Sequence, residues 1–298
     1  MKILIIGSKG FIGSAALNFY LHKNYVVFGC DIVNDYTSEN YFQIDATNSD
    51  FHQIFKSYDF DVCINCSGAA SVPQSLQNPL RDFTLNTYNV AKLLEAIKEY
   101  QPNCKFVNLS SAAVYGNPIE LPIKESSICN PISPYGIHKK FAEELCTEYQ
   151  AYFNLRTCNV RIFSAFGNGL KKQLIWDLYQ KFKTQNSIEL FGTGEETRDF
   201  IHVDDIISAL TYVIKNGDFK GESYNIANGQ EIKIKDIAKL FAKLTGSQKT
   251  IIFNQQQKEG DPIFWRADIT KIKSFGYEQK ISIEEGLRKY IQWANEQN

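Results

Sequence analysis

Two features are missing from this 298-residue chain: an excess of charge of one sign, and long apolar runs. Its 32 lysines and arginines balance 33 aspartates and glutamates, for a formal net charge of −1. That balance gives no electrostatic case for binding nucleic acid or an anionic membrane. No segment approaches the ~20 apolar residues of a membrane-spanning helix, and the start MKILIIG reaches glycine too soon for a signal peptide. We therefore expect a cytoplasmic protein that binds neither nucleic acid nor membranes.

An even number of cysteines is also missing, because the chain has seven. An odd number spread through apolar segments fits buried, reduced thiols better than a disulfide framework. Cys63 and Cys66 form a CxxC pair, but they lie in DVCINCS (61–67), a segment typical of a strand. Side chains three residues apart on a strand point to opposite faces. We therefore expect no redox or metal site at this cysteine pair, and no metal site elsewhere in the chain.

Short apolar segments alternate with helical patterns through the first half of the sequence. We expect strands near 2–7, 26–31, 41–45, 61–67, 105–111 and 156–163, and helices near 11–22, 48–57, 79–100 and 134–152. This alternation predicts an α/β fold with a doubly wound parallel sheet (Rossmann) over residues 1–168. The rhythm changes after residue 168. Residues 169–298 are predicted to form a smaller α/β substrate lobe, apart from segments near 200–227 that return to the main sheet.

Glycines at the first strand–helix junction indicate a phosphate site. In GSKGFIG (7–13), Gly7 permits a tight turn, Gly10 admits a pyrophosphate, and Gly13 lets the helix pack closely on the strand. Asp31 ends the second strand, eighteen residues after Gly13. A carboxylate there accepts hydrogen bonds from ribose hydroxyls and repels a 2′-phosphate. The pair of signals favours NAD as the cofactor.

Tyr135 and Lys139 open a long predicted helix and, four residues apart, share one of its faces. A free tyrosine has a pKa of about 10. A nearby ammonium together with a cationic nicotinamide lowers that pKa, so the tyrosine can exchange a proton with a substrate hydroxyl while hydride moves. His138 falls on another face of the helix, where we expect it to be solvated.

Taken together, the motifs resemble the extended short-chain dehydrogenase/reductase superfamily, and within it the NAD-dependent nucleotide-sugar epimerase/dehydratase family (UDP-glucose 4-epimerase-like enzymes). The resemblance covers nearly the whole chain. Besides GSKGFIG, it is carried by INCSGAA (64–70), LNTYNV (85–90), LSSAAVYG (109–116), SPYGIHK (133–139), VRIFSAFG (160–167), TRDFIHVDD (197–205) and EGDPIFWRAD (259–268).

The resemblance implies which residues bind NAD. The pyrophosphate would lie at the glycine turn, the adenosine ribose at Asp31 and the adenine near Asp45. The full implied set is Gly7, Gly10, Phe11, Ile12, Gly13, Asp31, Ile32, Asp45, Ala46, Ser67, Gly68, Ala69, Asn86, Tyr135, Lys139 and Ile162.

It also implies a catalytic triad of Ser111, Tyr135 and Lys139, in which Ser111 bonds the sugar oxygen that Tyr135 titrates. Ser110 is the alternative candidate for the catalytic serine, but counting back from the motif VYG favours Ser111. The implied substrate contacts are Ser111, Tyr135, Ser164, Arg198, Lys258 and Trp265.

Among these, Arg198 would clamp the nucleotide diphosphate and Trp265 would bound the sugar pocket. Three positions depart from the family pattern: Ser164 replaces an asparagine, Ile162 a tyrosine and Lys258 an arginine. These departures leave the choice of sugar open.

The two residues after Ser111 point to the reaction. Resembling dehydratases and decarboxylases carry an acid or base there, whereas this chain has Ala112 and Ala113. We therefore expect an NAD-dependent epimerase of a nucleotide-diphosphate sugar, acting at C4 through a 4-keto intermediate. The alternative is an NAD(P)H-dependent reductase of a 4-keto-6-deoxy nucleotide sugar. A 4,6-dehydratase, a decarboxylase or a non-catalytic NAD-binding protein ranks lower.

The resemblance further implies a homodimer, formed through the helices near 79–100 and 134–152, and a place in polysaccharide biosynthesis. The nucleotide, the sugar and the carbon epimerised are not specified by any motif.

Overall fold

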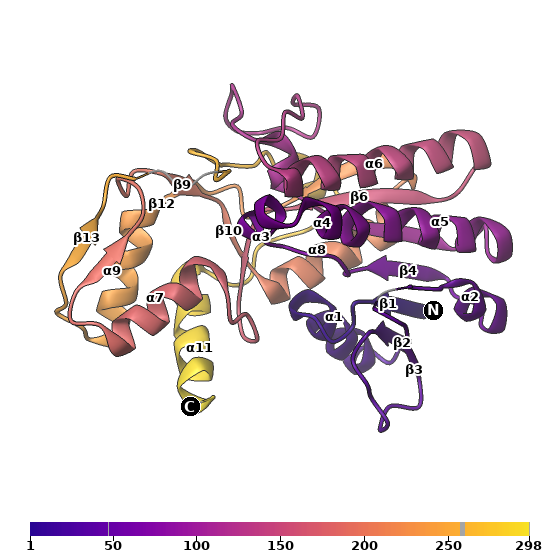
Figure 1. Cartoon of the computed structure of the whole chain (residues 1–298), viewed down its shortest axis with the longest axis horizontal. Coiled ribbons are helices and arrows are strands. Elements are labelled where there is room, and N and C mark those ends of the chain that lie inside the picture. Colours follow the sequence, from indigo (N-terminus) through magenta and orange to yellow (C-terminus); the bar gives the residue numbers. More distant parts are fainter. Residues whose placement is uncertain (47, 257–259, 298) are drawn as a thin grey trace.

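The computed structural model describes residues 1–46, 48–256 and 260–297. A seven-stranded sheet dominates the larger lobe, with the order β11-β6-β5-β4-β1-β2-β3 and parallel pairing throughout (Figure 1). The predicted doubly wound α/β fold is confirmed. The strands are β1 (Lys2–Ile6), β2 (Val26–Asp31), β3 (Tyr41–Gln43), β4 (Val62–Asn65), β5 (Lys105–Ser111), β6 (Thr157–Ile162) and β11 (Lys220–Ile226).

Both faces of this sheet are buried, because alternate side chains of each strand point to opposite sides. Ile3 and Ile5 of β1 face one core, while Leu4 and Ile6 face the other. The helices α1 (Phe11–His22), α8 (Val203–Asn216) and α10 (Thr270–Lys273) belong to the first layer; α2 (His52–Ser57), α5 (Asn89–Tyr100) and α6 (Pro134–Phe153) belong to the second.

The predicted helix at 79–100 is interrupted by a π-helical turn. It runs as α4 (Pro79–Phe83), the π turn η1 (Thr84–Tyr88) and α5, and it is preceded by α3 (Val72–Gln77). π turns inside α-helices occur often at functional sites. A short 3₁₀ turn, η2 (Ala112–Tyr115), follows β5.

The smaller lobe has its own apolar core, formed by α7 (Gln173–Thr184), α9 (Ile234–Thr245) and α11 (Ile283–Glu296) (Figure 1). Three small sheets complete the fold. They pair β7 (Ser164–Phe166) with β10 (Phe200–His202), β9 (Thr197–Arg198) with β12 (Ile232–Lys233), and β8 (Ile188–Leu190) with β13 (Ile251–Phe253).

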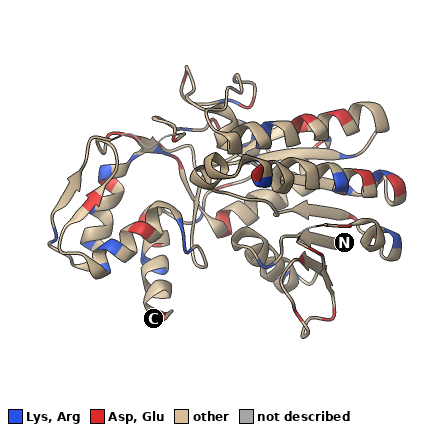
Figure 2. Ribbon diagram, viewed as in Figure 1, with Lys and Arg blue, Asp and Glu red and all other residues tan. Residues whose placement is uncertain are grey.

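Acidic and basic side chains are mixed over both lobes (Figure 2). Within the described residues, no helix combines the length and apolar character needed to cross a membrane.

Candidate active site

The candidate site lies at the carboxyl edge of the main sheet. β1 and β4 are neighbours there, yet the chain leaves them toward opposite halves of the sheet. Such a switch point opens the crevice in which α/β proteins bind ligands. Gly7 follows β1, Ser111 ends β5, and Ile162 ends β6 directly beside Ser111 in the strand register.

The first turn after β1 requires its glycines. A Cβ on Gly13 would lie 2.0 Å from the carbonyl oxygen of Gly7, so α1 approaches the strand more closely than any side chain allows. Gly7 has φ +78°, and its Cβ would lie 2.7 Å from the amide nitrogen of Ser67. The turn is thus pressed between α1 and the end of β4, with no room for side chains.

The N-terminus of α1 is open to a ligand. Gly10 is the N-cap residue of α1 and has no side chain that could bond the first amides of the helix. The first helical hydrogen bond runs from the Ser14 amide to the Gly10 carbonyl at 2.8 Å. The amides at the helix start, including those of Phe11 and Ile12, therefore lack helical acceptors. Together with the positive end of the helix dipole, they suit a pyrophosphate.

Asp31 is held in place by backbone amides. Its Oδ2 accepts from Lys9 N at 2.8 Å, and its Oδ1 accepts from Ile32 N at 2.7 Å. Each carboxylate oxygen keeps a free lone pair for a further donor, such as a ribose hydroxyl. The Lys9 ammonium is engaged with Asp35 and lies 5.0 Å from the centre of the Tyr41 ring, so its charge is already compensated.

The predicted adenine residues lie further out along the same edge. Asp45 and Ala46 follow β3 in an exposed turn, in which Asp45 Oδ1 accepts from Asn48 N at 3.0 Å. Beyond β4, the hydroxyl of Ser67 donates to the buried Asn65 Oδ1 at 2.6 Å, which fixes the start of the next loop.

Asn86, in the π turn, has a buried and unsatisfied amide. It is 1% exposed, and neither side-chain polar atom has a hydrogen-bond partner within the described residues. Gly68 (φ +116°) presses against it: a Cβ there would lie 2.4 Å from Asn86 Oδ1 and 3.5 Å from Lys139 Nζ. The half-buried Ala69 comes next. Leaving a polar group buried without a partner costs about 1–3 kcal/mol, as expected where a ligand supplies the missing bonds.

Ser111, Tyr135 and Lys139 come together between β5 and α6. Tyr135 is hydrogen-bonded to Ser111, and the Lys139 Nζ donates to the Leu109 carbonyl at 2.9 Å. The Ser111 Oγ also accepts from Ala113 N at 3.1 Å. The three predicted catalytic residues thus form one buried cluster at the sheet edge.

Burial governs the titration of this cluster. It raises the pKa of Tyr135 to about 12, and the hydrogen bond from Ser111 only partly opposes it. Burial lowers the pKa of Lys139 to about 8, and the charge of Asp82 opposes that change. The pKa of Tyr135 in the protein alone is therefore raised. The lowered pKa that the sequence predicts applies when a cationic nicotinamide lies beside the phenol. The Lys139 ammonium is directed at the Leu109 carbonyl.

The expectation that His138 is solvated is wrong. The residue is buried, and its Nδ1 lies 2.6 Å from Oδ1 of the equally buried Asp82. His138 stands three residues after Tyr135 on α6 and is covered by Asp82 of α4, a contact that the sequence does not reveal.

Ser110, the competitor of Ser111, is engaged elsewhere. Its hydroxyl donates to Glu143 Oε1 at 2.5 Å, and Glu143 in turn forms an ion pair with Arg161 at 2.6 Å. This buried network ties α6 to β5 and β6. Of the two serines, Ser111 is the one in contact with Tyr135.

Arg198, the predicted diphosphate clamp, sits on β9 in the smaller lobe. Its Nη1 donates to the Thr197 carbonyl at 2.8 Å, and its Nη2 lies 3.8 Å from an Asp261 carboxylate oxygen. A guanidinium has five N–H donors in a planar fork, so several remain for a diphosphate.

Trp265 contacts both this arginine and Gly116, the residue that follows η2. Its ring lies 5.6 Å from the Arg198 guanidinium carbon and packs edge-on against Phe163. Its Nε1 donates to the carbonyl of Gly116 at 3.1 Å. The indole therefore forms a fixed apolar wall between Arg198 and the segment that begins at Ser111.

The remaining predicted contacts are less informative. Ile162 is buried at the end of β6, and Ser164 is half-buried at the start of β7, where its amide donates to the Asp199 carbonyl at 2.9 Å. Lys258 lies outside the described residues.

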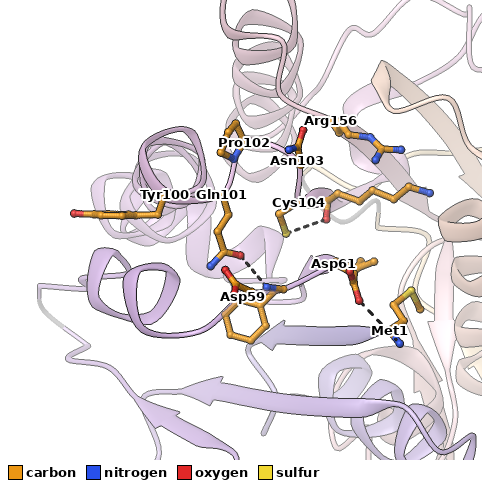
Figure 3. A pocket seen from close by; sticks show the side chains of 12 residues that line it. Met1, Asp59, Asp61, Tyr100, Gln101, Pro102, Asn103, Cys104 and Arg156 are labelled. Carbon is orange, nitrogen blue, oxygen red and sulfur yellow. Dashed lines mark hydrogen bonds and ion pairs between the residues drawn. The ribbon is translucent and has the colours of Figure 1, made fainter.

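A hollow of about 730 Å³ lies at the opposite, amino edge of the sheet (Figure 3). Met1, Asp61 and Arg156 are among the residues that line it. The polar atoms of its buried Gln101 are bonded to backbone groups, so the hollow offers a ligand no unsatisfied buried amide. It contributes nothing to the candidate site.

The model of one protein family, described as the NAD dependent epimerase/dehydratase family, matches residues 3–227. The chain belongs to this family. A UDP-glucuronate 4-epimerase of Thermodesulfobacterium geofontis is 30% identical and covers 98% of this chain and 96% of its own. A putative UDP-glucose 4-epimerase of Methanocaldococcus jannaschii is 26% identical and covers 99% of both chains. The crystal structure of UDP-glucuronic acid 4-epimerase from Bacillus cereus, in complex with UDP-glucuronic acid and NAD, matches with a TM-score of 0.91 at 26% identity, covering 100% of both chains.

As a member of this epimerase/dehydratase family, the protein uses NAD, and its residues fit that cofactor. The glycine turn leaves space and free amides for a pyrophosphate, and the carboxylate of Asp31 is oriented for ribose hydroxyls. The amide of Asn86, unpaired within the described residues, lies against Gly68 near Lys139, one of the three predicted catalytic residues.

Sequence reasoning missed Asp82 among the residues around this family site. Its charge raises the pKa of both Tyr135 and Lys139. The only signal was its position one helical turn before Asn86, which places both on the same side of the predicted helix.

Proposed function

We propose that this protein is an NAD-dependent epimerase of a nucleotide-diphosphate sugar that inverts C4 through a transient 4-keto sugar. The observation that carries this proposal is the Ser111–Tyr135 pair beside the glycine turn, followed by Ala112 and Ala113 in place of acids or bases. The relatives named as UDP-glucuronate and UDP-glucose 4-epimerases support it and make UDP-sugars the first substrates to test.

In this proposal Tyr135 removes the proton from the C4 hydroxyl and later returns it. Ser111, already bonded to Tyr135, aligns the same sugar oxygen. The ammonium of Lys139 stabilises negative charge on the phenol. Bound NAD would accept the C4 hydride and give it back, which makes the overall reaction redox-neutral.

Epimerisation also requires that the keto sugar turn over while its nucleotide stays bound. Arg198 would hold the diphosphate, and Trp265 offers the sugar a flat wall whose only polar group is already bonded to Gly116. A wall without free donors does not fix the sugar in one orientation, so we propose that it lets the ring turn.

The alternatives require groups that the site lacks or compensates. A dehydratase needs a second proton-transfer group near C5 and C6, but η2 begins with two alanines, one of them fully buried. A reductase that uses NADPH needs a free cation for the 2′-phosphate. Instead, the carboxylate of Asp31 would face the ribose, and Lys9 is paired with Asp35.

We further propose that the protein is a homodimer. Phe83, Tyr88 and Phe141 are 37–50% exposed and line a shallow apolar groove between α5 and α6. A second copy of this chain would cover them by placing the same two helices against it. Modified nucleotide sugars from such an enzyme would serve polysaccharide biosynthesis.

The experiment is to purify the protein, identify the co-purifying cofactor, and incubate it with UDP-, dTDP-, GDP- and CDP-sugars. Bound NAD and redox-neutral interconversion of two C4 epimers are expected. Conversion only of keto-sugars, with stoichiometric oxidation of added NADH or NADPH, would instead identify the reductase. Tyr135→Phe should retain NAD and lose turnover, and full activity in that variant would rule out Tyr135 as the base.

A further inference from the structure

A buried acid–imidazole pair, Asp82 and His138, ends one residue before Lys139 on α6. Asp82 is 2% and His138 9% exposed, and Asp82 Oδ1 lies 2.6 Å from His138 Nδ1. Asp82 Oδ2 is buried and has no hydrogen-bond partner within the described residues. The pair joins α4 to α6, and Thr87 strengthens the junction by donating to the His138 carbonyl at 2.9 Å.

Lys139 follows His138 on the helix, and its ammonium is buried. It donates to the Leu109 carbonyl, but no carboxylate of the described chain lies within ion-pair distance. A buried ammonium without a counter-charge is costly, and burial alone favours loss of its proton. Some negative group must offset that cost if the lysine is to stay charged.

Three groups act electrostatically on Lys139: Asp82 from α4, Cys66 beyond β4, and Glu143 from its own helix. Glu143 is already neutralised by Arg161 in the network with Ser110. Burial raises the pKa of Cys66 to about 12, so it is a neutral thiol near pH 7. Asp82 is therefore the carboxylate that remains to balance Lys139.

We propose that Asp82 and His138 are a positioning pair for Lys139: the Asp82 carboxylate is the buried counter-charge that keeps the lysine ammonium charged, and His138 holds this carboxylate in place. The proposal deepens the proposed epimerase and rests on it for its catalytic meaning. The charge state of Lys139 can nevertheless be measured without a substrate.

The primary test is nuclear magnetic resonance of the NAD-loaded protein labelled with ¹³C at lysine Cε. The Lys139 signal is assigned by its loss in Lys139→Arg, and its shift is followed with pH. In Asp82→Asn the titration midpoint of Lys139 should fall by about one pH unit or more, the effect of losing a nearby opposite charge. An unchanged midpoint overturns the proposal.

The histidine is tested in the same way. His138→Gln keeps an N–H donor for the carboxylate and should retain the wild-type midpoint, whereas His138→Phe should lower it. The double variant Asp82→Asn/His138→Phe should shift no further than Asp82→Asn. If Asp82→Asn fails to fold, the contrast between the two histidine variants decides, and equal midpoints for both overturn the role of His138.

A matched control is Asp205→Asn. Asp205 is equally buried, but its two oxygens accept from the Lys280 and Ile281 amides, and it does not act on Lys139. It should leave the Lys139 midpoint unchanged. A shift there as large as in Asp82→Asn would mean general loosening and overturn the proposal.

Turnover adds a second readout once a substrate is known. Asp82 raises the pKa of both Tyr135 and Lys139, so Asp82→Asn should move the whole pH–kcat profile to lower pH. A loss of kcat with no movement would indicate a merely structural residue and count against the pair. If the midpoint shifts but no nucleotide sugar is turned over, the positioning pair stands and the proposed function fails.

Discussion

At the residue scale, the site is defined by groups that the protein leaves unsatisfied. Within the described residues the side-chain amide of Asn86 has no partner, and the first amides of α1 have no helical acceptors. A folded chain rarely buries such groups unless a ligand completes them. We propose that these residues favour cofactor affinity at the expense of stability, two effects that can be separated by experiment.

Asn86→Leu should separate them. Leucine fills a similar volume and removes the unpaired amide, so the free energy of unfolding without NAD should stay equal or rise by about 1 kcal/mol. NAD affinity should fall about tenfold, equivalent to 1.4 kcal/mol. Denaturant unfolding and calorimetric titration measure the two quantities.

The matched control is Asn65→Leu. The Asn65 side chain bonds Ser67 and Asn108, so its loss should reduce stability. If Asn86→Leu destabilises the chain as much as Asn65→Leu, the amide of Asn86 is structural.

The titration of Lys139 gives a prediction for pH dependence. Burial lowers its pKa to about 8, so the ammonium is present below that pH and lost as the pH rises through it. If turnover needs the ammonium, kcat falls on the alkaline side. Lys139→Arg keeps its positive charge over this whole pH range. The variant should have a lower kcat, and its kcat should no longer fall on the alkaline side. Measurements of kcat between about pH 6 and 10 test this prediction. If kcat of the variant falls at the same alkaline pH as that of the wild type, the fall is due to the titration of another group.

At the scale of elements, two helices position the chemistry. Asn86 lies in the π turn η1, and Asp82 lies one helical turn earlier in α4. Asp82 contacts His138 of α6. Asn86 lies across Gly68 from Lys139 of the same helix. α6 starts at Pro134, and its cap residue Ser133 accepts from Gly136 N at 3.2 Å. Tyr135 therefore sits in the first helical turn, whose order depends on this cap.

Ser133→Ala should cost about 1 kcal/mol of stability, the usual effect of losing a helix cap, and should also lower kcat. Ser282→Ala removes an equivalent cap from α11, where Ser282 accepts from Glu285 N at 3.2 Å. It should cost similar stability and leave kcat unchanged. Thermal unfolding and turnover of both variants test this, and an equal loss of kcat would show that the cap acts through stability alone.

At the scale of the whole molecule, the apolar groove between α5 and α6 is the face on which we propose that a second copy of this chain docks. Phe141 is 41% exposed there, close to the layer that contains His138 and Lys139. Association through this face would cover Phe141 and shield the already buried His138 and Lys139 further from water.

Phe141→Glu should convert the proposed dimer into a monomer, because a buried, unpaired carboxylate opposes association. Ile119→Glu is the control: Ile119 is 91% exposed outside the groove and should leave the dimer intact. Analytical ultracentrifugation measures both. A monomeric wild type, or a Phe141→Glu variant that still dimerises, would contradict the proposed interface.

Local rules made much of the fold predictable. Alternating segments predicted the strands and helices of the larger lobe, and most bounds agree within two residues. The helix expected at 48–57 begins only at His52, because a turn capped by Asp45 occupies the preceding residues. The π turn within 79–100 was not predicted, since a one-residue change of helical period leaves no clear mark in composition.

The sequence by itself determined the glycine turn, the carboxylate at the end of β2, and the shared face of Tyr135 and Lys139. Each depends on neighbours within a few residues along the chain, through backbone sterics and helical period. Only the tertiary structure decided that His138 is buried against Asp82, that Trp265 bonds Gly116, and that the Lys139 ammonium turns to Leu109. Those contacts join segments up to 149 residues apart, and periodicity shows that a face is covered without showing what covers it.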